Sequence, residues 1–424
     1  MSAALIDPRC SLFSSPCSGY QDCTALANET VFQRSDPYRL NYGLPSPPNV
    51  SNLISHFNPR MCAWHSLHFA RLAAAVVGGA RVGRADAPGV RVVPVLGANG
   101  GYAADGEAKL SWLSAAWGPP AAAGLATMNI GAYVGPARNV TADPAITTDA
   151  VLVSLLANVA ALSPAAPTAY TSAIAGHAAA AAYYGVALHA YEGGPDTSGG
   201  STPRAVMALA NASLDDRMTD AVTGLVAARQ AWTGGTFNYF TLGAQPLAQP
   251  WGSYTTLFDL KVPDTPKSRG IDRIVSTPPA PLGAGWPLPL LNHSASFFVG
   301  YYSKDNMPPT NPIITWLPEN TTMNYLVRAA ACAATGVNVT VYMSGEKKSA
   351  GGDPLEVSVG AFLPPVILAA PPADGSRKDW QGVSALFPPP PAGAALASGS
   401  LTVRLRVAAS GVNYILRSLD VVCR

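Results

Sequence analysis

The clearest chemistry in the sequence lies in the segment His189-Ala190-Tyr191-Glu192-Gly193-Gly194-Pro195. An apolar run leads into it, so a buried strand would deliver Glu192 at its carboxyl end, and two glycines then let the backbone turn. A glutamate held there among aromatic rings suits a nucleophile or a proton donor with a tuned pKa. Strict alternation places Ala190 and Glu192 on one face, and His189 and Tyr191 on the other. The alternative is a Glu192 that only caps a turn or pairs with an arginine.

Strands and helices alternate around this segment. Short apolar or β-branched runs predict buried parallel strands at 89–96, 126–134, 186–192 and 237–242. Helical spacing of apolar residues predicts helices at 64–77, 108–117, 147–162, 167–184 and 214–232. This alternation is typical of a parallel α/β sheet or barrel, in which functional side chains gather at the carboxyl ends of the strands.

The rest of the chain has a different texture. Residues 1–60 form an irregular, cysteine-containing segment, residues 61–262 the α/β part, and residues 263–290 a proline-rich linker. Short strands separated by turn residues then predict an antiparallel β-sandwich over 291–424; they lie at 313–317, 323–331, 337–343, 355–359, 400–407 and 412–422. The predicted fold class is therefore α/β plus all-β.

The α/β part resembles a known enzyme group. The strings VVPVLGANGGY, LSWLSAAWG, MNIGAYVGP and LHAYEGGP, followed by WGSYTTLFDL, look like the second half of a clan A glycoside hydrolase (β/α)8 barrel. In that group a glutamate ends strand 7, which maps onto Glu192, and Trp251 matches a tryptophan that floors the sugar site after strand 8. Tyr191 flanks Glu192, and Tyr133 ends the strand at 126–134, where it would face the cleft or simply pack.

The same resemblance implies a second carboxylate. Clan A enzymes carry an Asn-Glu pair at the end of strand 4, and Asn28-Glu29 is the upstream dipeptide in the right order. Asn28 would hold a sugar hydroxyl and Glu29 would protonate the leaving oxygen, with the carboxyl pair ~5–5.5 Å apart in a retaining enzyme. The alternative is an exposed loop glutamate, because Asn28-Glu29-Thr30 is also a glycosylation sequon.

Counting units predicts a partial or degenerate TIM-type barrel. A complete one takes about 250 residues, at roughly 30 for each strand–helix unit. If the strand at 186–192 is strand 7, too few residues precede it for the earlier units. We therefore expect that the chain begins inside the barrel or that the first half of the barrel is supplied elsewhere.

The C-terminal part resembles a family 6-like carbohydrate-binding module of jelly-roll, galactose-binding-like architecture. The resemblance rests on NYLVRAAACAATGVNVTVYMSG and on the closing GSLTVRLRVAASGVNYILRSLDVV. It implies a sugar site at one loop edge, with Asn413 as the amide and Trp380 as the aromatic platform. Tyr342 and Tyr414 are further aromatic candidates, and packing is the alternative for Trp380.

Composition limits the partners. Charged residues make up 12% of the chain and the net charge is +2, so no nucleic-acid or acidic-surface partner is expected. No segment has the ~20 apolar residues of a membrane span. The zinc and phosphate-loop spacings that would indicate a cofactor are missing, so none is predicted. Polysaccharide or glycan is the predicted partner, and the oligomeric state is left open.

Seven N-x-S/T sequons favour a secreted, extracellular or cell-wall glycoprotein, although the N-terminus lacks a clear signal peptide. Six cysteines suit disulfides, with Cys332–Cys423 as one predicted pair. Two functional hypotheses follow. The protein is a retaining glycoside hydrolase that uses Glu192 and Glu29, or it is a non-catalytic carbohydrate-binding glycoprotein with a degenerate barrel. A purely structural assembly protein is a third possibility.

Overall fold

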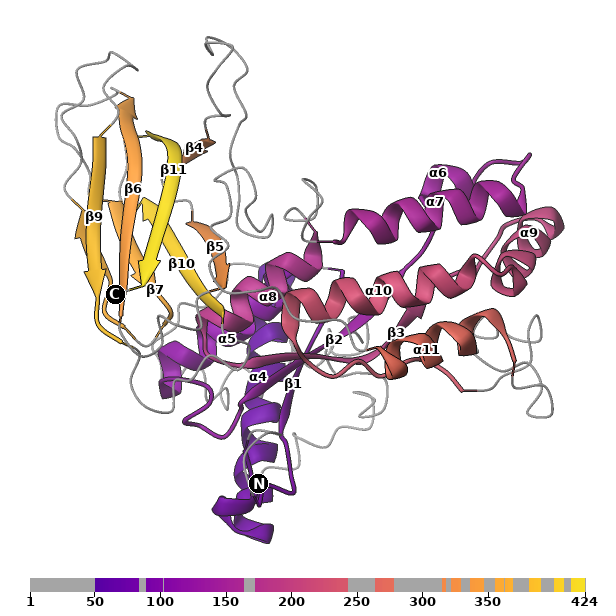
Figure 1. Ribbon diagram of the computed structural model, residues 1–424. Helices are drawn as coiled ribbons and strands as arrows, with labels where there is room; N and C mark the ends of the chain where they lie inside the picture. The colour runs from indigo at the N-terminus through magenta and orange to yellow at the C-terminus, as the bar shows by residue number, and fades with distance from the viewer. Residues whose placement is uncertain are drawn as a thin grey trace.

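The computed structural model describes thirteen stretches of the chain. They are residues 50–83, 89–101, 103–163, 172–242, 264–277, 315–317, 322–328, 336–346, 355–361, 363–368, 381–389, 400–407 and 413–423. Within them, a helical α/β part and a β-sandwich lie side by side (Figure 1).

The α/β part is built on a parallel sheet. Its strands are β1 (Val95–Ala98), β2 (Thr127–Val134) and β3 (Ala187–Pro195), and they neighbour one another in chain order. Phe237 adds a further parallel bridge to Ala190 on β3. Where a strand was predicted over 237–242, the described residues therefore form only this isolated bridge. Among the described residues the sheet does not close into a barrel.

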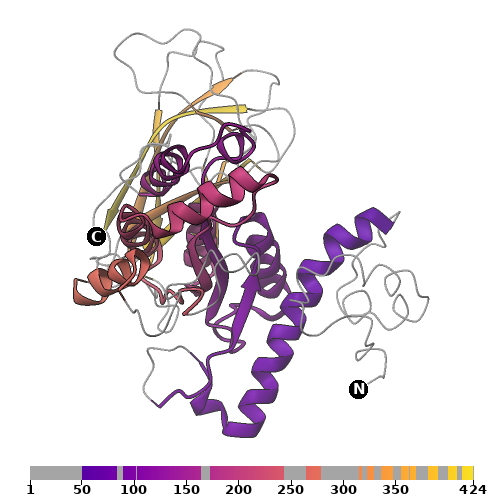
Figure 2. The same cartoon turned by 90° about the vertical axis from the view of Figure 1, so that its right-hand side faces the viewer.

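Helices connect and cover these strands, and their bounds are α4 (Val50–Val77), α5 (Ala103–Trp117), α6 (Arg138–Thr141), α7 (Thr148–Ala161), α8 (Ala173–Tyr183), α9 (Pro203–Leu214), α10 (Met218–Thr233) and α11 (Pro266–Ser276), with a short 3-10 turn at Gly79–Arg81. Side chains cap several of these helices. The hydroxyl groups of Thr147, Ser172 and Thr202 each accept a hydrogen bond from the backbone amide three residues further along the chain. Figure 2 shows the length of α4, which packs against α5 and β1.

Three of these helices differ from the prediction. The helix expected at 64–77 begins at Val50, inside the segment predicted to be irregular. The helix expected at 214–232 begins at Met218, because Asp215 accepts hydrogen bonds from the Arg217 backbone and side chain and so turns the chain before α10; the preceding helix, α9, was not predicted. The predicted proline-rich linker contains α11, where Thr265 and Ser268 form a reciprocal capping box and Pro266 occupies the first turn.

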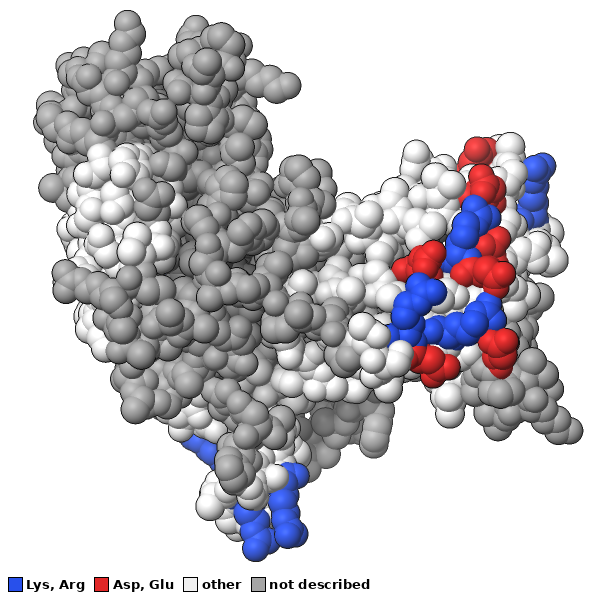
Figure 3. Space-filling view, in the orientation of Figure 1, with Lys and Arg blue, Asp and Glu red and all other residues white. Residues whose placement is uncertain are grey.

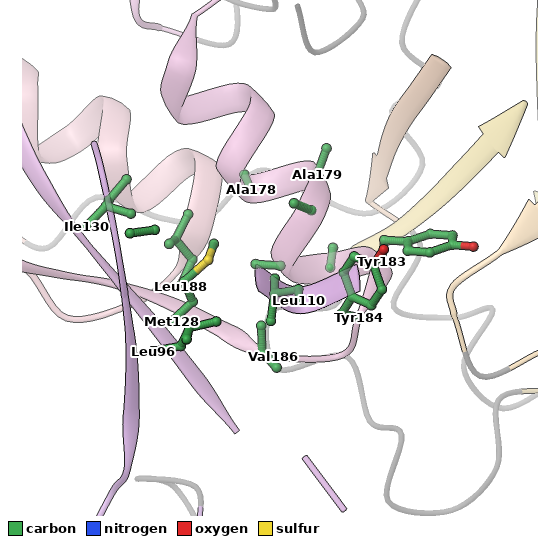
Figure 4. Close-up of a cluster of buried hydrophobic side chains, with 14 of the residues drawn as sticks. Leu96, Leu110, Met128, Ile130, Ala178, Ala179, Tyr183, Tyr184, Val186 and Leu188 are labelled. Atoms are coloured by element: carbon green, nitrogen blue, oxygen red, sulfur yellow. The ribbon is translucent and has the colours of Figure 1, made fainter. Parts of the chain in front are cut away.

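One face of the parallel sheet carries the main core. Leu96, Met128, Ile130 and Leu188 point toward α5 and α8 and are at most 3% exposed (Figure 4). Helix α8 is almost entirely buried, and its alanines allow close approach to the strands. Each such aliphatic side chain contributes roughly 1.5–3 kcal/mol by burial, so this layer fixes the sheet against its helices.

Helices α7, α9 and α10 form a second apolar cluster, and ion pairs bind α11 to α10. Arg269 pairs with Asp216 and with Asp264, while Arg273 pairs with Asp220. Figure 3 shows these charges as an intermixed red and blue patch far from the sandwich. The patch is exposed, so solvent screens these pairs and they contribute little to stability.

The C-terminal part is an antiparallel sandwich of two four-stranded sheets, ordered β5-β10-β7-β8 and β4-β11-β6-β9. The strands are β4 (Thr315–Leu317), β5 (Thr322–Arg328), β6 (Val337–Glu346), β7 (Leu355–Val359), β8 (Val366–Leu368), β9 (Gln381–Phe387), β10 (Ser400–Val407) and β11 (Asn413–Cys423). The predicted sandwich is confirmed at this level. Sequence patterning missed β8 and β9, which are short or lie between proline-rich stretches.

The sandwich is attached to the helical part through α8. Thr402 on β10 donates a 2.7 Å hydrogen bond to the Ala179 carbonyl, and the Ala361 amide donates one of 2.7 Å to the Tyr183 carbonyl. Arg404 donates to Glu107 on α5 at 2.7 Å and lies 3.6 Å from the Tyr183 ring centroid. Buried polar contacts of this kind fix the relative placement of the two parts.

No helix in the described stretches is long and apolar enough to cross a membrane. Cys62 is buried on α4. Cys10, Cys17, Cys23 and Cys332 lie outside the described residues, so the disulfide pairing stays a prediction.

Candidate functional site

The site is organised by a bulge in β3. Ala190 pairs with Ile130 on β2, but the next pair joins Glu192 to Gly131, which leaves Tyr191 as an extra residue on β3. In a bulge of this kind two residues oppose one, and the local side chains are re-aimed. The predicted alternation, with Glu192 on the Ala190 face, is therefore wrong: Glu192 shares a face with Gly131.

That face is opposite the core. On β2 the apolar residues Met128 and Ile130 point to the helices, and the alternate residues Thr127, Asn129 and Tyr133 point to the other side. His189 pairs with Asn129 and so lies on this polar face too. We call the set Thr127, Asn129, Gly131, Tyr133, His189, Tyr191 and Glu192 the polar face of the sheet.

Tyr191 lies over Gly131. A Cβ atom at residue 131 would be 3.4 Å from the Tyr191 hydroxyl oxygen and 3.8 Å from the Tyr133 ring. Burial raises the pKa of the Tyr191 hydroxyl, and the neighbouring Glu192 carboxylate raises it further by its charge and by hydrogen bonding. Tyr191 remains 47% exposed and Glu192 is half-buried, so both groups can reach a ligand.

Three polar atoms near these groups are buried without a hydrogen-bond partner among the described residues: Thr127 Oγ1, Asn129 Oδ1 and the Tyr239 hydroxyl. Burial and the nearby Tyr133 raise the pKa of Tyr239, which keeps its hydroxyl protonated. Since buried polar atoms are normally satisfied, such a group calls for a water molecule or a ligand atom. None of these three residues was predicted from the sequence, although polar and apolar residues alternate along β2 and this pattern includes Thr127 and Asn129.

Aromatic rings border the polar face. The Tyr133 and Phe240 rings meet edge to face at 6.5 Å. The Phe240 amide donates a 2.9 Å hydrogen bond to the Gly193 carbonyl, which holds the segment after Phe237 against β3. His189 accepts a 3.0 Å bond at Nδ1 from the Thr236 amide, so this nitrogen is committed to the same connection.

The carboxyl end of β1 has a structural role. The Asn99 side-chain oxygen Oδ1 accepts a 3.0 Å hydrogen bond from the Gly101 backbone amide. The Asn99 backbone amide donates a 2.9 Å hydrogen bond to the Asp105 carboxylate. The Asn99 carbonyl accepts from His177 Nε2 at 2.8 Å, and Lys109 ties Asp105 to the Gly97 carbonyl. These bonds close a turn on the helix side of the sheet.

The next carboxylate along the chain does not form a retaining pair with Glu192. Asp196 follows Glu192 by four positions, about 13 Å along a strand, and its Oδ1 accepts from the Ser198 amide and hydroxyl at 2.8 and 2.6 Å. That spacing exceeds the ~5–5.5 Å of a retaining pair. The described stretches contain no cluster of three or more histidine, cysteine or acidic residues that could hold a metal.

Of the predicted site residues, the structure brings Tyr133, Tyr191 and Glu192 together on the polar face. Asn28, Glu29, Trp251 and Trp380 lie outside the described residues. Asn413 opens β11, where it pairs with Glu346 across the sheet.

No protein-family model matches the chain, and no curated protein matches it either. Similar solved structures include a family 35 carbohydrate-binding module from Cellvibrio japonicus, at 13% identity over 29% of this chain and 82% of the module, with a TM-score of 0.23. A family 35 module from Clostridium thermocellum has 12% identity over 33% of this chain and all of the module, with a TM-score of 0.24.

A third similar structure is a cycloisomaltooligosaccharide glucanotransferase from Paenibacillus sp. It shares 9% identity over 76% of this chain and 38% of its own, with a TM-score of 0.24. At such TM-scores these likenesses carry no functional argument.

Proposed function

We propose that the protein binds glycans through the polar face of its parallel sheet, around the bulge where Glu192 of β3 pairs with Gly131 of β2. The observation that carries this proposal is the bulge at Tyr191. It puts an aromatic ring and a carboxylate together on the face that already holds Asn129.

The chemistry of these groups suits a sugar. A pyranose offers hydroxyl groups that donate and accept, and C–H faces that stack on aromatic rings. Asn129 Oδ1 and the Glu192 carboxylate would accept from sugar hydroxyls. Tyr191 and Tyr133 would supply the apolar contact. Sugar hydroxyls would also form hydrogen bonds with buried polar atoms that have no partner among the described residues, and so remove the free-energy cost of leaving these atoms unpaired.

The test is isothermal titration of the full chain with xylan, β-1,4-galactan, dextran and polygalacturonate. We expect binding to at least one polymer, and Glu192→Gln to weaken it by roughly 10- to 100-fold, since hydrogen bonds to charged groups contribute about 1.5–3 kcal/mol. Asp272→Asn on α11 makes a similar change at an exposed site and should bind like the parent. Unchanged binding by Glu192→Gln, or no binding to any polymer, would contradict the proposal.

A retaining glycoside hydrolase is the second candidate. The observation that favours it is that Glu192 lies in the carboxyl-terminal half of a parallel strand, three residues before its end, and barrel enzymes carry their catalytic groups toward that end. Glu29 is the proposed acid/base partner, and the parallel sheet would be part of a (β/α)8 barrel. Release of reducing ends from the same four polymers tests this candidate. Activity that Glu192→Gln and Glu29→Gln both abolish would establish it, and activity that survives both changes would exclude it.

We also propose a secreted glycoprotein. Three of its sequons fall on described surface positions: Asn139 and Asn211 are exposed, and Asn338 is half-buried on β6. Expression in a secreting eukaryotic cell should give a product whose mass falls on treatment with a peptide N-glycosidase. A product with no mass change would count against this proposal.

A further inference from the structure

The last turns of α4 leave large apolar side chains in solvent. Phe69, Leu72 and Val76 are 55%, 52% and 76% exposed, although the same helix buries Leu67 and Ala70 in the main core. At 3.6 residues per turn, the three exposed side chains fall within an arc of about 60° on the side of the helix opposite this core. Figure 2 shows α4 running along the outside of the helical part. The helix therefore carries a second apolar stripe, about 10 Å long, that remains exposed.

Arginines lie at the same end of the helix. Arg71 is exposed on α4, and its guanidinium lies 5.8 Å from the ring centroid of the half-buried Trp117. Arg81 and Arg91 are also exposed, and the Arg91 amide donates a 2.8 Å hydrogen bond to the Arg81 carbonyl just after the helix. On the face shown in Figure 3, basic side chains gather at the lower end of the molecule, and no acidic side chain of a described residue adjoins them there. Among the described residues this charge is thus not balanced by carboxylates, unlike the paired charges of α10 and α11.

The sequence around this end of α4 is strongly basic. Residues 60–95 contain five arginines and a single acidic residue, Asp86, which gives a net charge of +4. The whole chain carries only +2, so the rest of the chain is net negative. The overall charge, which argues against an acidic surface as partner, therefore hides a local excess of positive charge. Such an excess attracts anionic surfaces.

The apolar stripe and the arginines together limit the kinds of partner. A nucleic acid or a sulfated polysaccharide would bind the arginines but would leave Leu72 and Val76 in water. A lipid bilayer offers phosphate groups at its surface and acyl chains directly below them. Helices bind such a surface by burying their apolar side roughly 5–10 Å into the boundary between headgroups and acyl chains, while basic side chains attract anionic lipids. Trp117 beside Arg71 suits the headgroup level, where tryptophan is enriched.

The basic end of α4 is the set of Phe69, Arg71, Leu72, Val76, Arg81 and Arg91. We propose that it binds the surface of an anionic lipid membrane, separately from the polar face of the parallel sheet. Its apolar side chains enter the interface, with α4 parallel to the membrane plane. Its guanidinium groups bind lipid phosphates, while the aliphatic stems of the arginines lie along the acyl boundary. The contact is peripheral, because α4 lies on the bilayer and does not cross it.

Co-sedimentation of the full chain with lipid vesicles tests this site. We expect vesicles with about one-third phosphatidylserine in phosphatidylcholine to bind roughly 20-fold more tightly than phosphatidylcholine alone, and high salt to weaken this binding, since the attraction is electrostatic. Arg81→Gln should weaken binding about fivefold, which is the typical contribution of one arginine near an anionic surface. Arg138→Gln removes an exposed arginine from the distant α6 and should change binding less than about twofold.

Leu72→Ser tests the apolar stripe. We expect it to weaken vesicle binding about tenfold, because serine removes apolar surface that enters the interface. Leu214→Ser on α9 is the matched control, since Leu214 is 54% exposed and Leu72 is 52% exposed. Both positions face solvent, so circular dichroism should show the parent secondary structure. Glu192→Gln should bind vesicles like the parent, which separates failure of this site from failure of the polar face.

The proposal is overturned if vesicles with and without phosphatidylserine bind equally, or if either Arg81→Gln or Leu72→Ser binds like the parent. Dextran sulfate that binds through Arg81 while no vesicle binds would identify a polyanion site instead. A dimer in sedimentation equilibrium that Leu72→Ser dissociates would assign the apolar stripe to a second copy of the chain, and this too would contradict the proposal.

Discussion

Glu192 lies opposite Gly131 in the parallel sheet, one residue out of the register that Ala190 and Ile130 establish. This offset turns the Glu192 carboxylate from the core side of the sheet to its polar side. It also places the Tyr191 ring over a position without a side chain. The candidate site thus depends on a missing Cβ as much as on the groups that are present.

Gly131→Val tests that dependence. The valine side chain would project toward the Tyr191 hydroxyl, 3.4 Å from the position of its Cβ, so Tyr191 must move away from Glu192. We expect glycan binding to fall at least fivefold with secondary structure retained, as measured by titration and circular dichroism. Gly79→Val, where a Cβ meets nothing within 4 Å, is the control. A Gly131→Val protein that binds normally would show that Tyr191 need not lie there.

The junction between the sandwich and the helices gives a stability prediction. Arg404 and Glu107 have side chains 13% and 10% exposed, and Glu107 Oε2 has no partner among the described residues. Arg404→Ala leaves a buried carboxylate without its cation, which costs about 3–5 kcal/mol. Chemical unfolding of the full chain should show this as a lower midpoint for the parts that the junction joins.

Arg406 supplies the matched control on the same strand. Its pair with Glu356 spans 3.9 Å, and the arginine side chain is 54% exposed. Arg406→Ala should therefore cost less than about 1 kcal/mol. Equal effects of the two substitutions would contradict a stabilising role for the buried junction.

The buried His177 leads us to expect that the protein is less stable in acid. Burial lowers its pKa to about 4, and Arg229 and Lys109 act in the same direction, while the bond to Asn99 and the charge of Asp105 oppose them. Between pH 6.5 and 4 the unfolded chain binds a proton that the native His177 does not. Native stability should therefore fall by up to about 3 kcal/mol as the pH drops through this window.

Urea unfolding at pH 7, 6, 5 and 4 measures this effect. His177→Gln should remove about 3 kcal/mol of the pH dependence, because glutamine does not titrate. His68→Gln, on the exposed side of α4, should leave the pH dependence unchanged. An identical pH profile for His177→Gln and the parent would disprove the assignment.

Much of the fold follows from pattern. Short apolar runs predicted both β2 and β3, and short strands separated by turn residues predicted the sandwich. The bulge at Tyr191 could not be predicted from the sequence, because it depends on how β3 pairs with β2 and not on the composition of β3. Helix α11 was missed because its prolines suggested a linker, whereas Pro266 at the first turn and the Thr265 cap favour a helix start.

The site was predicted in part for a similar reason. Glu192, Tyr191 and Tyr133 stand out by residue type, and all three lie on the polar face. Asn129 and Thr127 are ordinary strand residues in the sequence. They matter because their side-chain oxygens are buried without a hydrogen-bond partner among the described residues, and this burial is visible only in the folded structure.

The most direct test of glycan binding at the polar face is hydroxyl-radical footprinting of the unmodified protein, with and without its tightest-binding polymer. The proposal predicts that bound glycan lowers the oxidation rate of Tyr191 severalfold, since this ring is 47% exposed in the free protein. Saturating glycan that leaves the oxidation of Tyr191 unchanged would place the binding site elsewhere and contradict the role assigned to Glu192.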